Sequence, residues 1–497
     1  MSTSKRITIN AASAIIQVAF TAVLYFFLYK YLLNAIGIKQ LGVWSLILSF
    51  SSIANLANFG ITSGLVKFVA EYLIEDDKTK VGKLIFTSII TMSILFSIVS
   101  LLVFWAAHYF LHLVIDKEFL DIALVILPFS LVSLSINAVA GVFTSVLEGY
   151  QKNYLRNFIY IISGILMYVL VLTLAPTYHL KGVAIAQACQ AVFILLIAVI
   201  LTYRLSPYNR FSHWKWSKNS FNELFNYGYK FQIVSIAQLL YEPTTKILLS
   251  KFGGLALLGH YEMATRLVNQ FRALLVNANQ VVVPVIAENA VSKSKTEVKE
   301  FFRKMNRILL FFTLPSSTLL IVITPIISII WIGSLNYEFI FAVLVLMLAS
   351  EINILCGPSY FSCMGEGHLS ILIKTHIGMA VVNLILGYVL GWIWGGNGII
   401  IAWGLALSAG SIYLIWSYSK IISINYIRIF GSNDKLLMAI TILISVLWIL
   451  LMFFNKLQFS NLTIILISCG AILFYIPVIF KNDNFARITS LLKKKQL

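Results

Sequence analysis

The chain has 497 residues, of which 60% are hydrophobic and only 11% are charged, and its mean hydropathy is +0.90. This composition excludes a soluble globular domain and favours a protein that crosses a membrane many times. The formal net charge of +18 does not indicate nucleic-acid binding, because the basic residues gather in loops between apolar runs, as in loops that face anionic lipid.

Apolar runs long enough to cross about 30 Å of hydrocarbon as a helix recur along the whole chain. We predict fourteen transmembrane helices, at residues 9–33, 42–66, 84–107, 120–147, 156–174, 182–203, 226–250, 255–283, 308–332, 339–363, 371–394, 398–420, 436–454 and 462–480. The alternating pattern over about ten residues that marks a membrane β-strand is missing. The expected fold class is therefore an all-α integral membrane protein.

Dense basic clusters indicate the orientation of the chain. They lie at Lys78 to Lys83, Arg204 to Lys218, Lys293 to Arg307 and Lys493 to Lys495. Each cluster follows an even number of predicted helices, so the positive-inside rule places all of them, and both termini, in the cytoplasm.

The chain contains an internal repeat. At an offset of 217 residues, Gly37, Gly42 and Trp44 match Gly254, Gly259 and Tyr261. At an offset of 216, Ile136-Asn137, Gly141 and Gly149 match Ile352-Asn353, Gly357 and Gly365. Since six helices precede the second copy, both copies enter the membrane in the same direction, which predicts a parallel repeat.

The repeat divides the chain into four predicted parts. Residues 1–203 form a first six-helix bundle, and residues 226–421 form a second. Residues 204–225 join them as a cytoplasmic or interfacial linker, and residues 422–497 add two helices and a basic cytoplasmic tail.

Six charged residues fall inside predicted helices, namely Glu242, Lys246, Glu262, Arg266, Arg272 and Glu351. A charge in hydrocarbon costs at least about 2.5–3.5 kcal/mol, so each of them must face protein or water. The 255–283 helix is the richest. Its polar residues fall on one face, in the order Glu262, Thr265, Arg266, Asn269, Arg272, Asn277 and Gln280.

The repeat carries a muted copy of this polar face. A shift of 217 residues places Ser49 opposite Arg266 and Asn55 opposite Arg272 on the 42–66 helix. Ser135 in the 120–147 helix corresponds in the same way to Glu351. We therefore expect the 42–66 and 255–283 helices to line one cavity, with the 9–33 and 226–250 helices beside them.

Structural roles compete with roles in binding for these charges. Glu242 is expected to neutralise Lys246, four residues away, or Arg266 on the neighbouring helix. Glu351 either balances an arginine, with Arg272 as its partner, or carries a coupling proton or cation. The planar guanidinium of Arg266 or Arg272 would suit a phosphate. These alternatives stay open at the level of the sequence.

Catalytic and metal-binding motifs are missing from the sequence. The seven histidines are scattered, the four cysteines lack metal-ligand spacing, and no phosphate-binding glycine loop is seen. We therefore expect a transporter rather than an enzyme, with no catalytic residues, metal or cofactor.

The residues from Leu248 through Gly254, Gly259-His260-Tyr261, Ala264 and Pro284 to Ala287 resemble the second-half signature of polysaccharide exporters of the MOP superfamily. The segments from Gly37 to Ala70 and from Gly141 to Gly149 resemble the first half. The resemblance covers the whole chain and is closest to Wzx-type flippases for O-antigen and capsule repeat units. It implies two six-helix bundles in a V-shaped arrangement, plus two helices.

The resemblance also implies a function. Such a protein moves undecaprenyl-pyrophosphate-linked oligosaccharides across the bacterial cytoplasmic membrane by alternating access, for O-antigen, capsule or exopolysaccharide assembly. On this hypothesis, Arg266, Arg272 and Lys246 attract the pyrophosphate. Polar groups for the sugars would come from Asn269, Asn55, Ser49 and Ser52, and the coupling or ion-pair carboxylates would be Glu242, Glu262 and Glu351.

The expected partners are the lipid-linked glycan, membrane lipids, and a polysaccharide polymerase or other assembly protein. We expect the protein to work as a monomer, without nucleic acid, and with a proton or sodium ion as the coupling ion to be considered.

Two alternative functions remain. A cation-coupled multidrug antiporter would use the three membrane carboxylates, but drug-exporting relatives usually have twelve spans. A lipid II flippase would resemble relatives with several arginines in the first helix, and the 9–33 helix has none.

Overall fold

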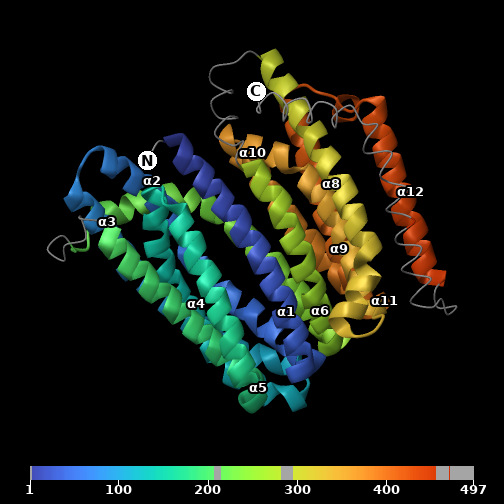
Figure 1. Cartoon of the computed structure of the whole chain (residues 1–497), viewed down its shortest axis with the longest axis horizontal. Coiled ribbons are helices and arrows are strands. Elements are labelled where there is room, and N and C mark those ends of the chain that lie inside the picture. The colour runs from blue at the N-terminus through green and yellow to red at the C-terminus, as the bar shows by residue number, and fades with distance from the viewer. Residues whose placement is uncertain (1–2, 206–213, 281–294, 455–469, 471–497) are drawn as a thin grey trace. The chain divides into compact units, whose positions relative to one another are not determined.

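A computed structural model of the chain describes residues 3–205, 214–280 and 295–454, together with residue 470. Within these residues every regular element is helical (Figure 1). The first part of the chain forms α1 (Thr3–Ser52), η1 (Ile53–Asn58), α2 (Ile61–Ile74), α3 (Lys78–Phe110), η2 (Leu111–Leu113), α4 (Lys117–Gly149) and α5 (Asn153–Leu205). The rest forms α6 (Lys218–Gln280), α8 (Lys295–Ile332), α9 (Tyr337–Leu355), α10 (Gly357–Gly365), α11 (Leu369–Ile421), η4 (Tyr426–Ile429) and α12 (Ser432–Phe454).

The all-α membrane fold predicted from the sequence is confirmed. Seven helices of the described chain are long and apolar enough to cross a membrane. Several long helices consist of two legs joined at a kink, so the number of elements is smaller than the number of predicted spans. The predicted span at 462–480 lies almost wholly outside the described residues, and the total of fourteen therefore stays a prediction.

The kinks make the internal repeat visible in the backbone. Gly37 in α1 has φ 79° and ψ 166°, and Gly254 in α6 has φ 77° and ψ 171°. His179 in α5 (φ 47°, ψ −132°) has the same relation to Gly395 in α11 (φ 61°, ψ −147°). Each kink joins the two legs of a hairpin, and glycine makes a positive φ accessible without a clash at Cβ.

The predicted 42–66 helix is interrupted, which the sequence pattern did not indicate. The α-helix ends at Ser52, and after the 3₁₀ turn of η1 both Phe59 (φ 45°) and Gly60 (φ 68°) are left-handed. The break is held by α6, because a Cβ on Gly228 would lie 2.2 Å from the Phe59 carbonyl oxygen. The side-chain amide of Gln232 donates to the Leu56 carbonyl oxygen at 2.9 Å, which satisfies one acceptor released by the break.

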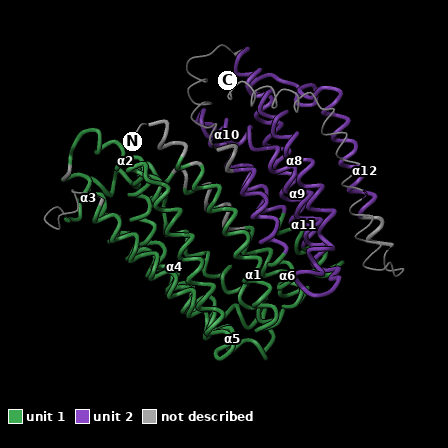
Figure 2. Tube along the Cα trace, in the orientation of Figure 1, with its two compact units in different colours: residues 1–263, 383–399 green, residues 264–382, 400–497 purple. Residues whose placement is uncertain are grey.

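The chain divides into two compact units (Figure 2). The first contains residues 1–263 and 383–399, and the second contains residues 264–382 and 400–497. This division reflects packing and falls within α6 and α11, whereas the predicted bundle boundaries follow the sequence repeat and stay a prediction.

In the first unit, α3, α4 and α5 pack side by side, and α1 packs on α4 and α5 (Figure 1). The core under α2 is formed by fully buried aliphatic side chains, including Leu65, Val69 and Leu84. Asp77 caps α3 by accepting a hydrogen bond from the Lys80 backbone N–H at 2.9 Å, and this bond lowers the pKa of Asp77 below its ordinary value.

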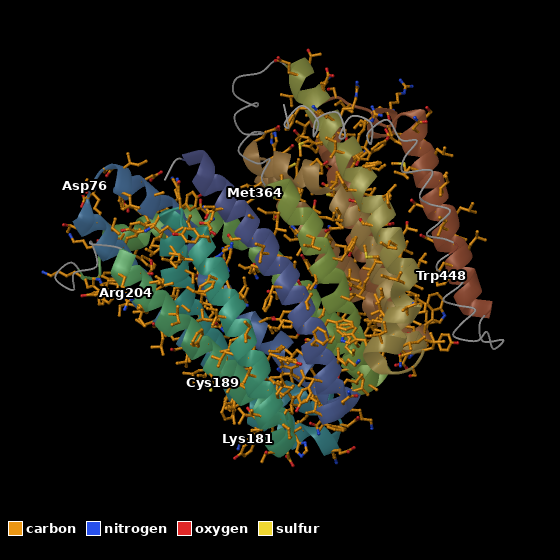
Figure 3. All side chains as sticks on the ribbon, viewed as in Figure 1. Asp76, Lys181, Cys189, Arg204, Met364 and Trp448 are labelled. Atoms are coloured by element: carbon orange, nitrogen blue, oxygen red, sulfur yellow. The ribbon has the colours of Figure 1, made fainter. Side chains whose placement is uncertain are left out.

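The two ends of the first unit can be recognised by labelled residues. Asp76 and Arg204 lie at one end of its helices, and Lys181 lies at the opposite end (Figure 3). In the predicted topology, Asp76 and Arg204 belong to cytoplasmic loops and Lys181 to an outer loop.

In the second unit, α8 packs against α9 and α12. The Arg307 Nε donates to Asp434 Oδ2 at 2.7 Å, and the Gly431 backbone N–H donates to the same oxygen at 3.0 Å. Since Asp434 is fully buried, this ion pair joins the first turn of α12 to α8.

Candidate functional site

The carboxylate of Glu262 is the centre of a buried polar cluster in the first unit. Glu262 Oε1 accepts a hydrogen bond from the Tyr29 hydroxyl at 3.0 Å, and Oε2 accepts one from the Ser45 hydroxyl at 2.6 Å. The Lys246 ammonium lies 2.8 Å from Oε2. All four side chains are buried, and we call this set, Tyr29, Ser45, Lys246 and Glu262, the Glu262 cluster.

The helix hairpins bring these residues together. Tyr29 and Ser45 lie on the two legs of α1, on either side of the kink at Gly37. Lys246 and Glu262 lie on the two legs of α6, on either side of Gly254. A charged pair survives burial only when its remaining hydrogen-bonding capacity is used, and the two hydroxyl groups do this for Glu262.

Glu242 is the second partner of Lys246. Its Oε1 lies 3.0 Å from the Lys246 Nζ, so the expected i, i+4 pair is present, although the Glu242 side chain is 58% exposed. Lys246 therefore faces two carboxylates while only 2% of its side chain is exposed. This geometry favours an ion-pair role for Lys246 over direct binding of a pyrophosphate.

Arg272 is placed in the second unit, on the last leg of α6. Its Nε and Nη2 both donate to the Asn353 Oδ1, at 3.0 and 2.7 Å. The Asn353 amide nitrogen in turn donates to the Ser411 hydroxyl at 3.0 Å, and Ser411 donates to the Leu407 carbonyl oxygen. The guanidinium is thus oriented by a chain of neutral groups from α9 and α11.

Glu351 lies two residues before Asn353 on α9 and is buried. Its Oε1 accepts a hydrogen bond from the Ser317 hydroxyl of α8. Among the described residues Glu351 has no ion pair, so the pairing with Arg272 that the sequence left open is not seen there. A buried carboxylate with only a hydroxyl partner is costly in its charged form.

The remaining predicted binding residues are spread over both units. Arg266 is half-buried and Asn269 is exposed, both on the second-unit part of α6. In the first unit, Ser49 is buried on α1, while the Ser52 hydroxyl donates to the Ser49 carbonyl oxygen at 2.7 Å and Asn55 is half-buried in η1. The side chains of Asn277 and Gln280, which also belong to the predicted polar face, lie outside the described residues.

Several residues of these networks were not identified from the sequence. Asn353 was visible only as part of the repeat, and Ser317 and Ser411 carried no signal because hydroxyl residues are common in membrane helices. Asn383 was also missed. It is fully buried in the first unit, where its amide donates to the Thr245 hydroxyl at 3.0 Å.

Within the described residues, no group of three or more histidine, cysteine, aspartate or glutamate side chains is arranged to hold a metal ion. The polar groups described above are arranged for charge pairing and hydrogen bonding within membrane helices.

Comparison with known proteins identifies the class. Residues 35–337, more than half of the chain, match the family described as polysaccharide biosynthesis protein. The chain belongs to this family. No curated protein matches the chain.

Solved structures of similar fold are transporters of the MOP superfamily. A multidrug resistance MATE family transporter in an inward-facing conformation has a TM-score of 0.70 at 15% identity, covering 82% of this chain and 98% of that chain. The lipid II flippase MurJ in an inward closed conformation has a TM-score of 0.64 at 17% identity, covering 94% and 98%. A transporter from Pyrococcus furiosus, whose binding pocket is described as having reverse polarity, has a TM-score of 0.61 at 13% identity, covering 84% and 96%.

These likenesses establish the fold and, with the family match, the general function. The protein is a multi-pass membrane transporter or flippase of the MOP superfamily and not an enzyme.

Proposed function

We propose that this protein is a flippase for a polyprenyl-pyrophosphate-linked oligosaccharide, which it moves from the inner to the outer leaflet of the bacterial cytoplasmic membrane. The observation that carries the proposal is the match of residues 35–337 to the polysaccharide biosynthesis family. Both termini lie in the cytoplasm in this proposal, and an undecaprenyl chain is the expected lipid.

The distribution of charge supports an anionic substrate. Of the six charges in membrane helices, Glu242, Lys246 and Glu262 join in one network in the first unit. The second unit holds Arg266, Arg272 and Glu351, two bases against one acid. A cavity wall with excess positive charge favours a phosphate group over a cationic drug.

Arg272 is the best-defined phosphate ligand in this proposal. Asn353 holds two guanidinium donors, Nε and Nη2, on one oxygen atom, which fixes the plane of the side chain. A guanidinium with a fixed plane can bind phosphate oxygens in pairs at little cost in side-chain entropy.

The extent of the structural likeness also favours a flippase over a drug antiporter. The lipid II flippase fold covers 94% of this chain, whereas the MATE family transporter covers 82%. Lipid II itself is disfavoured by the absence of arginine from residues 9–33. The membrane potential, negative inside, would assist outward movement of an anion by about 2.3 kcal/mol per charge per 100 mV.

Deletion of the gene in its native host tests this proposal. We expect loss of a surface polysaccharide and accumulation of the lipid-linked repeat unit in the inner leaflet, both reversed by the wild-type gene on a plasmid. Extraction of polyprenyl-linked glycans and surface staining measure the two quantities. If surface polysaccharide were unchanged and sensitivity to cationic drugs increased, the antiporter function would replace this one.

A further inference from the structure

The Glu262 cluster is built from two pairs of residues that are equivalent in the internal repeat. Ser45 and Glu262 are separated by 217 residues, the offset of the repeat, and they are in direct contact. Tyr29 and Lys246 are related by the same offset, and both contact Glu262. Residues that are equivalent in two copies can touch each other only where the copies meet, at the axis that relates them.

The four residues also lie at one depth. Tyr29 and Ser45 are each eight residues from the kink at Gly37, and Lys246 and Glu262 are each eight residues from the kink at Gly254. At 1.5 Å per residue, this places the cluster about 12 Å below the tips of both hairpins. The predicted topology puts these tips on the outer side of the membrane.

The two hairpins approach closely between the cluster and the tips. A Cβ added to Gly42 would lie 2.0 Å from the Leu255 carbonyl oxygen, and one added to Gly259 would lie 2.4 Å from the Ile38 carbonyl oxygen. These contacts are reciprocal, because Leu255 is the repeat equivalent of Ile38. The outer ends of the hairpins are therefore in backbone contact in this structure.

We propose that the Glu262 cluster is a latch that closes the outer side of the transporter and must open to release the substrate. A transporter exposes its site to one side of the membrane at a time, so contacts that join the two repeats at one end have to break and reform in each cycle. This inference rests on the class of protein, a MOP transporter, and not on the proposed substrate.

The distribution of charge in the cluster suits such a reversible contact. The ion pair between Lys246 and Glu262 lies within one hairpin, since both residues belong to α6. Only the hydroxyl groups of Tyr29 and Ser45 cross from α1 to the carboxylate. When the hairpins separate, two hydroxyl bonds are exchanged for bonds to water, while the buried carboxylate keeps its cation.

The test measures access to Ser49 from outside. Ser49 is buried on α1 one helical turn below Ser45, away from the hairpin tip. With the four native cysteines replaced by serine, Ser49→Cys provides a thiol, and a membrane-impermeant maleimide added to intact cells reports its exposure. Tyr29→Phe combined with Ser45→Ala removes both crossing bonds and leaves the ion pair in place. We expect this double change to raise the labelling rate about tenfold.

Tyr31→Phe is the matched control. The Tyr31 hydroxyl lies on the same leg of α1 but donates to the Leu172 carbonyl oxygen of α5, within the first copy of the repeat. Its loss should leave labelling unchanged. If the double variant inserts poorly, Ser45→Ala alone should still raise labelling severalfold, since it removes the 2.6 Å bond. Labelling that stays at the unmodified rate in a well-inserted variant, or that occurs only from the cytoplasmic side, would overturn the proposal.

Discussion

At the scale of single residues, the charges in the membrane helices fall into two kinds of environment. Lys246 and Glu262 neutralise each other and are buried together, so they define the packing of hairpins in the first unit. Arg272 is oriented by Asn353 through two hydrogen bonds to one amide oxygen. Glu351, two residues before Asn353, is bonded to Ser317. The first environment is a closed network, whereas the second presents an oriented cation.

Arg272 is the residue on which the proposed substrate can be tested. We expect Arg272→Ala to leave the protein inserted in the membrane and to lower surface polysaccharide about tenfold or more, because a hydrogen bond to a charged group contributes about 1.5–3 kcal/mol. Arg272→Lys should restore part of the export, since an ammonium keeps the charge and loses the planar fork. Quantitative immunoblotting of membranes and measurement of surface glycan separate the two effects.

Arg204→Ala is a suitable control, because Arg204 is exposed at the end of α5. A structural role for Arg272 would have a different signature. Protein levels would fall in Arg272→Ala and recover in the double variant with Glu351→Ala, and export would then be intact.

At the scale of elements, the long helices of this protein are hairpins and broken rods. The kinks at Gly37 and Gly254 share one backbone conformation, so the hairpins of α1 and α6 turn in the same way. The break at Phe59 and Gly60 has a different origin. Its left-handed residues face Gly228 of α6 at backbone distance, where a side chain would clash. Tertiary contact, and not local propensity alone, ends the helix there.

The attachment of α12 is a second feature of this scale. Asp434 is fully buried and binds both Arg307 of α8 and the Gly431 backbone N–H. We expect Asp434→Asn to weaken this attachment by roughly 1–3 kcal/mol, because Arg307 loses its counter-charge while remaining partly exposed to solvent. Limited proteolysis in detergent should then cleave faster in the segment between α11 and α12.

Asp121→Asn is the matched change on an exposed aspartate of α4 and should leave the cleavage rate unchanged. Equal proteolysis of the Asp434→Asn variant and the wild-type protein would show that α12 is held by its apolar contacts alone.

At the scale of the whole molecule, the parallel repeat and the basic loops predict one orientation in the membrane. The first unit agrees with a two-ended arrangement, since Asp76 and Arg204 lie at one end and Lys181 at the other (Figure 3). Positive charge in the loops of one side favours that side as the cytoplasmic one.

Reporter fusions test this orientation. Fusions after Lys215 and Lys495 should be active as cytoplasmic reporters, and a fusion after Asn397 should report the outside. Asn397 follows the kink at Gly395, at the tip of the α11 hairpin. A periplasmic signal from Lys215 would invert the topology and would move the Glu262 cluster to the cytoplasmic side.

The sequence by itself determined the properties that depend on local composition and on repetition. Apolar runs, basic loops and the offset of 217 residues predicted the all-α membrane fold and the family, because hydrophobicity and matching glycines can be seen without knowledge of contacts. The same reasoning found all six charges that the helices carry.

Only the tertiary structure decided which groups these charges meet. Pairing depends on the rotation and depth of helices that are far apart in the sequence, and a repeat offset gives equivalence without giving contact. Glu262 is bonded by Ser45, its own equivalent in the first copy, and Glu351 is bonded by Ser317 on α8. The break at Gly60 likewise required Gly228 to approach from α6. These partners follow from packing, because a buried charge accepts whichever donor the fold brings within hydrogen-bonding distance.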